Sequence, residues 1–331
     1  MNSNINYGSL VISLDFEMMW GCHDWSTPQE YGVTNIKSVR YVIDSMLKMF
    51  SMYGVHATFA TVGLVFCKNT SDVEHYLPSI KPTYENINLS PYKDDYINQI
   101  SKENQELYFA PDVIVKLKSN KGIEIGTHTF SHYFCWEPGQ SLQQFRADLQ
   151  AMNSISYDND IDIKSIVFPK NQVSSDYLKV CSLEGIKCYR GNSSKYFGDS
   201  KTKFGSLRNR ICRLLDSYIN VGGMTTFKYS DIDIEEQPLN IRASRMLRPY
   251  SKIFSVFEPL RLNRVQSELK YAALNNEVYH LWWHPHNFGA NVNQNLSFLE
   301  KILKCYKECS ERYGMKSYTM SELMQLLVET K

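Results

Sequence analysis

Short apolar segments alternate with amphipathic segments along most of this chain. The clearest apolar segment, residues 10–14 (Leu-Val-Ile-Ser-Leu), is rich in β-branched residues and ends at Asp15. Residues 35–53 then carry apolar positions at helical spacing, and Gly54 provides a stop signal for that helix. Continuously apolar strands are typical of a parallel sheet that is covered by helices. The alternation therefore predicts an α/β fold.

The same alternation continues to the carboxyl end of the chain. Strands are expected at residues 10–14, 55–62, 122–126, 165–168, 186–190 and 278–283, and helices at residues 35–53, 111–119, 140–157, 173–184, 262–275, 294–312 and after 319. An α/β barrel and an open doubly wound sheet both fit this order.

Polar residues stand where the predicted strands end. Asp15, His128, Arg190 and His284 each occupy such a position, and Pro169 stands at the end of a further strand. The carboxyl ends of parallel strands meet at one edge of a sheet, and both architectures build their sites there. We therefore expect the functional site at that edge.

Composition argues against several classes of protein. The formal net charge is +1, which argues against a surface that grips nucleic acid. No apolar run reaches the roughly 18 residues that a membrane-spanning helix needs. The first eight residues lack Lys and Arg, so we expect neither a signal peptide nor an anchor, and we expect a cytoplasmic protein. The eight scattered cysteines are then expected to be free thiols.

An acidic motif and a histidine motif could together form a hydrolytic site. Asp15 and Glu17 are two residues apart at a strand end, which directs both carboxylates to one face. His128 and His132 are four apart, which places two imidazoles on one face of a helical turn, about right to share a metal ion. Taken alone, each pair also fits solvated acids or ordinary core and surface histidines. Taken together, two histidines and one carboxylate leave a metal position open for catalysis, with a second carboxylate beside it.

A third motif, Trp283-His284-Pro285-His286-Asn287, follows the last predicted strand. A histidine in this position could act as a general acid near neutral pH, because its unperturbed pKa is about 6.5. The neighbouring tryptophans could stack on a sugar ring or pack in the core.

These motifs resemble those of the polysaccharide deacetylase family, carbohydrate esterase family 4, in a divergent branch. Residues 126–132 (GTHTFSH) are similar to the family's histidine motif, and residues 57–59 (ATF) to its second-strand signature. Residues 13–15 (SLD) resemble the start of its first motif, and residues 281–284 (LWWH) resemble its last. The resemblance implies one domain over residues 1–331, a distorted (β/α) barrel of about seven parallel strands, with insertions near residues 68–110 and 193–260.

The resemblance also implies an activity and a set of roles. The expected activity is metal-dependent removal of an N-acyl group, in the first place acetyl, from an amino sugar in bacterial surface-polysaccharide biosynthesis such as that of the O-antigen. Asp15 corresponds to the catalytic base, and Glu17, His128 and His132 to the ligands of one divalent ion, with zinc favoured. His284 corresponds to the general acid, with His286 as the alternative.

The chain departs from the family pattern at two points. A phenylalanine separates Asp15 from Glu17, where the common pattern has adjacent aspartates. Residues 168–172 (FPKNQ) replace the family's Arg-Pro-Pro-Tyr-Gly segment, which carries the arginine that orients the base. Lys170 and Arg190 are candidates to replace it, although neither is expected to offer the matching fork in a matching place. The residues expected to bind substrate are Lys170, Arg190, Trp283, His286 and Asn287.

Arginines recur between residues 208 and 264. They could form a solvated surface, or some could bind the phosphates of a nucleotide- or lipid-linked sugar. The set comprises Arg208, Arg210, Arg213, Arg242, Arg245, Arg248, Arg261 and Arg264.

Two alternatives to deacetylation remain at this point. One is a deformylase or another hydrolase of a non-peptide C–N bond, and the other is a non-catalytic glycan-binding relative. Glycoside hydrolysis is disfavoured, because Asp15 and Glu17 on one strand do not easily flank a bond from opposite sides.

Overall fold

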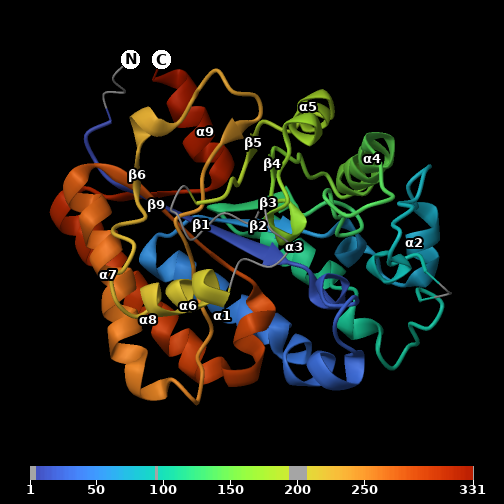
Figure 1. Ribbon diagram of the computed structural model, residues 1–331, viewed down its shortest axis with the longest axis horizontal. Coiled ribbons are helices and arrows are strands. Elements are labelled where there is room, and N and C mark those ends of the chain that lie inside the picture. The colour runs from blue at the N-terminus through green and yellow to red at the C-terminus, as the bar shows by residue number, and fades with distance from the viewer. Residues whose placement is uncertain (1–4, 94–95, 194–206, 331) are drawn as a thin grey trace.

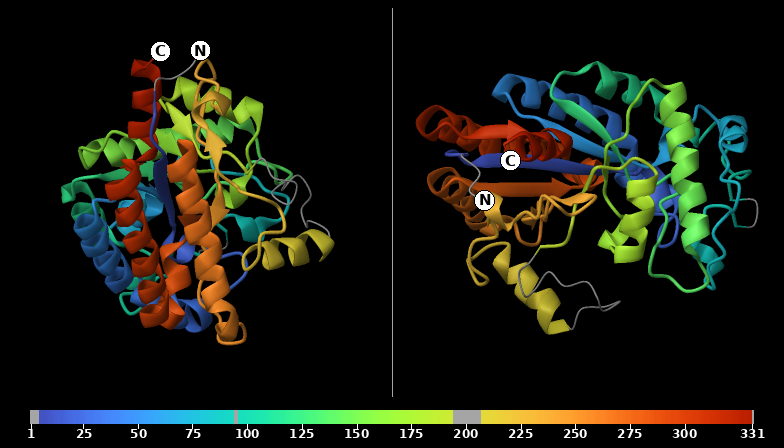
Figure 2. Two further views of the ribbon diagram at one scale, coloured as in Figure 1. Left: turned by 90° about the vertical axis from the view of Figure 1, so that its left-hand side faces the viewer. Right: turned by 90° about the horizontal axis from the view of Figure 1, so that it is seen from above.

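The computed structural model describes residues 5–93, 96–193 and 207–330. A curled, mostly parallel sheet forms its centre, and helices surround the sheet (Figures 1 and 2). The strands are β1 Ser9–Phe16, β2 Ala57–Thr61, β3 Ile123–Thr127, β4 Ser165–Ile166, β5 Cys188–Tyr189, β6 Phe227–Lys228, β7 Leu239–Asn240, β8 Arg245–Met246, β9 Glu277–Trp283 and β10 Lys316–Tyr318. The α-helices are α1 Val39–Tyr53, α2 Thr70–His75, α3 Pro111–Ser119, α4 Leu142–Asp158, α5 Ser175–Leu183, α6 Leu207–Asp216, α7 Glu258–Asn275, α8 Val292–Tyr313 and α9 Met320–Glu329.

The strand order is β6-β9-β1-β2-β3-β4-β5-β7, with β10 also pairing with β1 and β8 with β9. Residues 239–247, which include β7 and β8, connect the two sides of this order. Their backbone N–H groups donate to carbonyls of residues 187–191 on one side, while those of Ser244 and Leu247 donate to carbonyls of β9 on the other. Counted as one strand, this segment completes a ring of seven parallel strands in the described part of the chain. The distorted barrel expected from the sequence motifs is confirmed.

The segment near residues 193–260 differs from its expectation as an irregular insertion. Residues 194–206 lie outside the described residues. The rest contains helix α6 and three short strands, β6, β7 and β8. Each of these strands pairs with the sheet over two residues. Strands this short leave no alternating pattern in the sequence, because a period of two residues needs several repeats to be seen.

Strand β1 lies inside the sheet between β9 on one side and β10 and β2 on the other. All eight of its residues are buried, as expected for a mostly apolar strand inside a parallel sheet that helices cover. Its register aligns the strand ends: Thr61 of β2 is opposite both Phe16 and Thr127. The residues that follow β1 and β3 therefore emerge at the same level.

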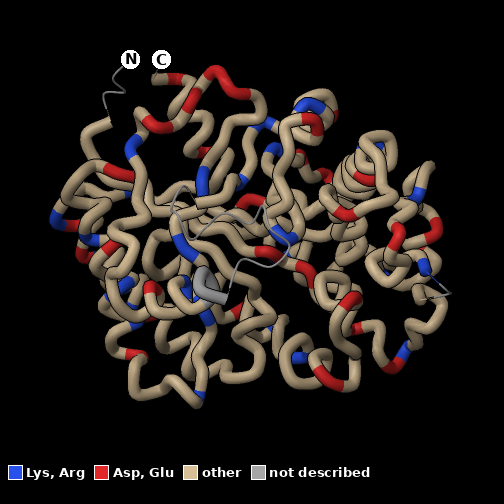
Figure 3. The backbone as a smooth tube through the Cα atoms, in the orientation of Figure 1, with Lys and Arg blue, Asp and Glu red and all other residues tan. Residues whose placement is uncertain are grey.

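Positions of Lys and Arg are interspersed with positions of Asp and Glu along the backbone in Figure 3. None of the helices in the described residues is sufficiently long and apolar to span a bilayer. All eight cysteines are free, and all but Cys212 are buried.

Candidate active site

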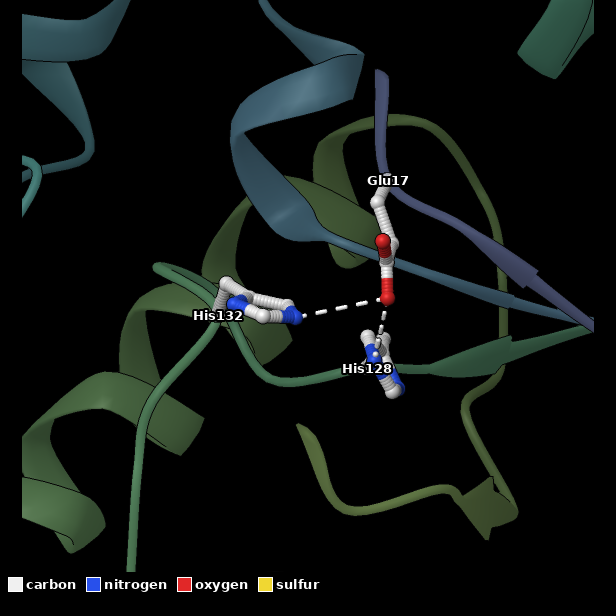
Figure 4. Close-up of side chains that lie close together, drawn as sticks. All are labelled: Glu17, His128 and His132. Carbon is white, nitrogen blue, oxygen red and sulfur yellow. Dashed lines mark ion pairs between the residues drawn. The ribbon is translucent and has the colours of Figure 1, made fainter. Parts of the chain in front are cut away.

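Glu17, His128 and His132 converge at the carboxyl ends of β1 and β3 (Figure 4). Glu17 Oε1 lies 3.0 Å from His128 Nε2 and 3.3 Å from His132 Nε2. The three side chains are buried, and one ligand atom of each lies within 4.8 Å of the others. This arrangement could hold a metal ion.

The hydrogen bonds of His128 prepare one of its nitrogens for a cation. Its Nδ1 lies 2.7 Å from the carbonyl oxygen of Val167, which can only accept, so Nδ1 carries the proton. Nε2 therefore presents its lone pair towards Glu17, and this buried atom has no hydrogen-bond partner. Such an atom is costly unless a ligand satisfies it. A cation held by Glu17, His128 and His132 would do so, and the residues present therefore fit a metal ion.

Burial lowers the pKa of His132 to about 4, so the ring is neutral near pH 7. The neutral ring is the form that coordinates metals. In Glu17 burial opposes the charged carboxylate, but His284, His132 and His128 lower its pKa well below the usual range. Glu17 is therefore ionised, as a ligand must be.

The two histidines lie on an irregular loop after β3, and the expectation of a helical turn is wrong. Thr129 and His132 adopt φ angles of 64° and 59°, in the left-handed region that non-glycine residues seldom occupy. The carboxylate of Asp148, on α4, accepts hydrogen bonds from the backbone N–H of Phe130 at 2.7 Å and of Ser131 at 3.1 Å, and from the Ser131 hydroxyl. These contacts hold a strained loop in the conformation that presents both imidazoles.

Asp148 was missed by the sequence analysis. It is fully buried, and it shares the buried face of α4 with Phe145, Leu149 and Met152. A carboxylate within an apolar helical stripe was the available signal, because buried acids are rare unless they have partners.

Asp15 is held by Arg190, which follows β5. One guanidinium nitrogen donates to Oδ1 at 2.7 Å and the other to Oδ2 at 2.8 Å. Contrary to the expectation that neither Lys170 nor Arg190 offers a matching fork, Arg190 supplies it from a neighbouring strand end rather than from the segment at residues 168–172. Burial opposes the charge of Asp15, but Arg190, His128 and His284 together lower its pKa, so the carboxylate is ionised.

Further polar groups fix Arg190 in place. It donates to Ser13 Oγ at 3.0 Å and to Asn171 Oδ1 at 3.1 Å, and its guanidinium lies 4.1 Å from the ring centre of Trp282. His280 Nε2 lies 2.8 Å from Ser13 Oγ. Ser13, Asn171 and Trp282 thus contact Arg190 directly, and His280 contacts Ser13. None of the four was predicted as a site residue, because only the folded sheet brings them together.

His284 lies beside both carboxylates. Its Nε2 is 3.6 Å from Asp15 Oδ2 and 3.5 Å from Glu17 Oε1. The Tyr31 hydroxyl donates to Asn287 Oδ1 at 3.1 Å, which leaves Asn287 Nδ2 facing His284 Nδ1 at 3.3 Å. This contact fixes the ring with Nε2 towards both carboxylates. Asn287 therefore contacts His284 directly.

The two histidines of this motif differ in exposure. The His284 side chain is 22% exposed, whereas that of His286 is 6% exposed. Burial acts against protonation of His284, but the carboxylates of Glu17 and Asp15 raise its pKa above the usual value. Burial and the charge of His284 instead lower the pKa of His286 to about 3. His284 is the histidine that a substrate can reach.

Trp283 and Lys170, which were expected to bind substrate, both have other partners in the structure. Trp283 is fully buried and stacks on Phe288, so it is not available to a substrate. Its neighbour Trp282 instead packs against His284, with 5.7 Å between the ring centres. The ammonium group of Lys170 lies 2.7 Å from a carboxylate oxygen of Asp24 and does not pair with Asp15.

Comparisons with known proteins place the fold. The structure is similar to that of a protein named as a polysaccharide deacetylase from Mycobacterium smegmatis, with a TM-score of 0.58, 9% identity, and coverage of 99% of this chain and 93% of that one. The resemblance predicted from the motifs is thus confirmed at the level of the fold. The chain has the fold of the polysaccharide deacetylases.

The same fold occurs with other activities. An allantoinase matches with a TM-score of 0.53, 10% identity, and coverage of 97% of this chain and 90% of that one. A 4-α-glucanotransferase from Thermococcus litoralis matches with a TM-score of 0.52, 9% identity, and coverage of 97% and 40%. No family model matches the sequence, and no curated protein matches it. The function must therefore be argued from the site.

Proposed function

We propose that this protein is a metal-dependent hydrolase that removes an N-acyl group, in the first place acetyl, from an amino sugar destined for a surface polysaccharide. The observation that carries the proposal is the buried group of Glu17, His128 and His132, with Asp15 held in a fixed orientation beside it. Zinc is the ion we propose, because two imidazoles and one carboxylate are ligands that it prefers.

The chain's own residues supply the proton transfers. A bound divalent ion would polarise the acyl carbonyl and lower the pKa of a water molecule. Asp15, kept ionised by Arg190, takes a proton from the attacking water as the water oxygen bonds to the carbonyl carbon. The protonated His284 ring then gives its Nε2 proton to the leaving nitrogen, the C–N bond breaks, and the ring becomes neutral. The products are a free amine and a carboxylic acid, and the proton taken up by Asp15 replaces the one that His284 has lost.

Two features support this distribution of roles. The fork from Arg190 directs the carboxylate oxygens of Asp15 and prevents the side chain from rotating. The contact of Asn287 with Nδ1 fixes the His284 ring so that Nε2 faces the site. Base and acid are thus separate groups, each fixed by its own partner.

The test combines metal content with product analysis. Purified protein is expected to contain about one equivalent of zinc by elemental analysis, and to release acetate from an N-acetylated amino sugar. The Asp15→Asn variant is expected to keep the metal and to lose turnover. Unaltered turnover in that variant would reject the assigned base.

The same measurements decide between the alternatives. Release of formate but not acetate would identify a deformylase of the same mechanism. A protein without metal that binds a sugar and releases neither acid would be a glycan-binding relative.

A further inference from the structure

A pocket of about 400 Å³ adjoins the catalytic groups on the side of Trp282. Trp282 and Asn171 line it, and both contact Arg190, the residue that holds Asp15. Trp282 also packs against His284. A molecule in this pocket would therefore extend from the reacting groups, as the part of a substrate beyond the acylated sugar must.

Two arginines near the pocket are already neutralised. Arg245 forms ion pairs with Asp216 at 2.7 Å and with Glu268 at 2.6 Å. Arg264 shares the same two carboxylates, at 3.4 and 3.0 Å. These residues form a closed network that joins the end of α6 to α7, and their role is structural.

Arg248 differs from them. It lines the pocket and is half-buried, and no carboxylate of the described residues lies within ion-pair distance of it. Burial lowers the pKa of the Arg248 guanidinium, and the charges of Arg213 and Arg245 lower it further, whereas Tyr218 raises it. A partly buried guanidinium next to other cations favours an anionic ligand, and phosphate accepts several of its N–H groups at once.

An apolar patch lies beside this pocket. It comprises Ile211, Leu215, Ile219, Ile253, Val256 and Phe257, all exposed. Tyr218 joins its two segments through ring contacts of 6.0 Å with Phe254 and 6.1 Å with Phe257. Helix α6, which carries part of the patch, projects from the body of the molecule (Figure 2).

The patch has the chemistry of a lipid-contacting surface. Ile253 is 85% exposed and Val256 is 82% exposed, so neither contributes to the core. Contiguous exposed aliphatic side chains mark an interaction site, and aliphatic groups next to arginines are typical of helices that lie on anionic membranes. A nucleotide has no aliphatic chain to match this surface.

We propose that Arg248 binds the phosphate group of a lipid-linked amino sugar, and that the apolar patch lies against the membrane surface that carries the lipid. The proposal rests on the proposed function, because it places the acylated sugar at Asp15 and His284. The pocket, which lies between these catalytic groups and the apolar patch, would then hold the phosphate that joins the sugar to the lipid.

The phosphate part is tested by titration calorimetry without turnover. N-acetylglucosamine 1-phosphate and N-acetylglucosamine are titrated into the Asp15→Asn protein, in which hydrolysis does not disturb the heats. Adding Arg248→Ala is expected to weaken binding of the phosphosugar about tenfold to a hundredfold and to leave the affinity for the free sugar unchanged. Arg312→Ala, on α8 outside the pocket, is the matched control. Equal affinity of both sugars for the protein with Arg248 intact overturns the phosphate site.

The membrane part is tested by sedimentation with vesicles of phosphatidylglycerol and phosphatidylcholine. The wild-type protein is expected to sediment with the vesicles, and the double variant Ile253→Asp/Val256→Asp to bind at least tenfold less. Tyr157→Asp, on α4, is the control because Tyr157 is 81% exposed but lies outside the patch. Absence of vesicle binding, or an equal loss in the control, overturns the patch as a membrane surface.

A nucleotide source is distinguished in the same set of measurements. If UDP-N-acetylglucosamine binds at least tenfold tighter than N-acetylglucosamine 1-phosphate and the protein does not bind vesicles, the phosphate belongs to a nucleotide and the lipid proposal fails. Metal content and acetate release are separate readouts. Failure of the pocket proposal is therefore distinguishable from failure of the proposed function.

Discussion

The two ends of the barrel carry the same pair of residue types in opposite situations. At the amino ends of the strands, His56 Nδ1 lies 2.7 Å from Glu322 Oε2, and both side chains are about 40% exposed. At the carboxyl ends, His128 Nε2 lies 3.0 Å from Glu17 Oε1, and the side chains are 1% and 5% exposed. Only the second pair leaves a buried ring nitrogen without a hydrogen-bond partner.

The difference shows where function resides. Glu322 also accepts the backbone N–H of Thr319 at the start of α9, so the His56 pair is part of a helix cap in contact with water. Such a pair contributes little to stability and needs no ligand. The pair at the carboxyl ends is withdrawn from water and incompletely satisfied, a state that is costly unless an ion completes it.

The largest expected effect comes from removing a histidine at the carboxyl ends of the strands, compared with removing one at the amino ends. His128→Ala is expected to lose the metal and reduce activity to background, because two ligands do not retain a catalytic ion firmly. His56→Ala is the matched control and should keep both. The measurements are elemental analysis and acetate release. Comparable metal loss in the two variants would mean that the ends of the barrel do not differ in function.

Replacement of the fork on the base should have the next largest effect. In Arg190→Lys the positive charge remains, but a single ammonium group cannot bond both oxygens of Asp15. We expect kcat to fall about tenfold to a hundredfold with an unchanged metal content. Steady-state kinetics with metal analysis checks this. A variant with wild-type kcat would show that charge alone suffices.

Replacement of the buried carboxyl group that holds the ligand loop should cost stability. Asp148→Asn replaces an oxygen that accepts N–H groups with an amide that cannot accept all of them, so we expect a loss of about 1–3 kcal/mol in the free energy of unfolding. Asp158→Asn, at the exposed end of the same helix, should change it by less than about 0.5 kcal/mol. Urea denaturation measures both. Equal losses would contradict a special role for the buried carboxylate.

The smallest effect concerns pH at the amino ends. The hydrogen bond to Glu322 raises the pKa of His56, so the stability that it contributes is present below pH 6.5 and is lost as the pH rises through the raised value. Burial opposes the charge of Glu322, but His56 lowers its pKa, so this share is lost as the pH falls below about 4.5. Between these limits, the free energy of unfolding of the wild type should exceed that of His56→Gln by less than about 1 kcal/mol, since solvent screens the pair.

Denaturation midpoints of wild type and His56→Gln between pH 5 and 8 measure this difference. A gap that widens with rising pH would contradict the assigned direction of the shift. A gap of several kcal/mol would mean that the pair is not screened as its exposure indicates.

The fold was predictable wherever a segment had a long pattern of its own. The helix expected at residues 111–119 has those bounds in α3, and the strand expected at residues 278–283 corresponds to β9, one residue longer. The closing segment at residues 239–247 was missed, because its strands are too short to show a period and its partners are distant in sequence.

From the amino-acid order alone one could infer the alternation of strands and helices, the edge at which polar groups collect, and Glu17, His128 and His132 as one group. These depend on local periodicity and on the rule that parallel strands end together. The irregular loop of the two histidines, the support from Asp148 and the Arg190 fork could not be inferred. Each depends on side chains from separate elements meeting at a few ångströms, and such distances arise only when the packed sheet sets the register of its strands.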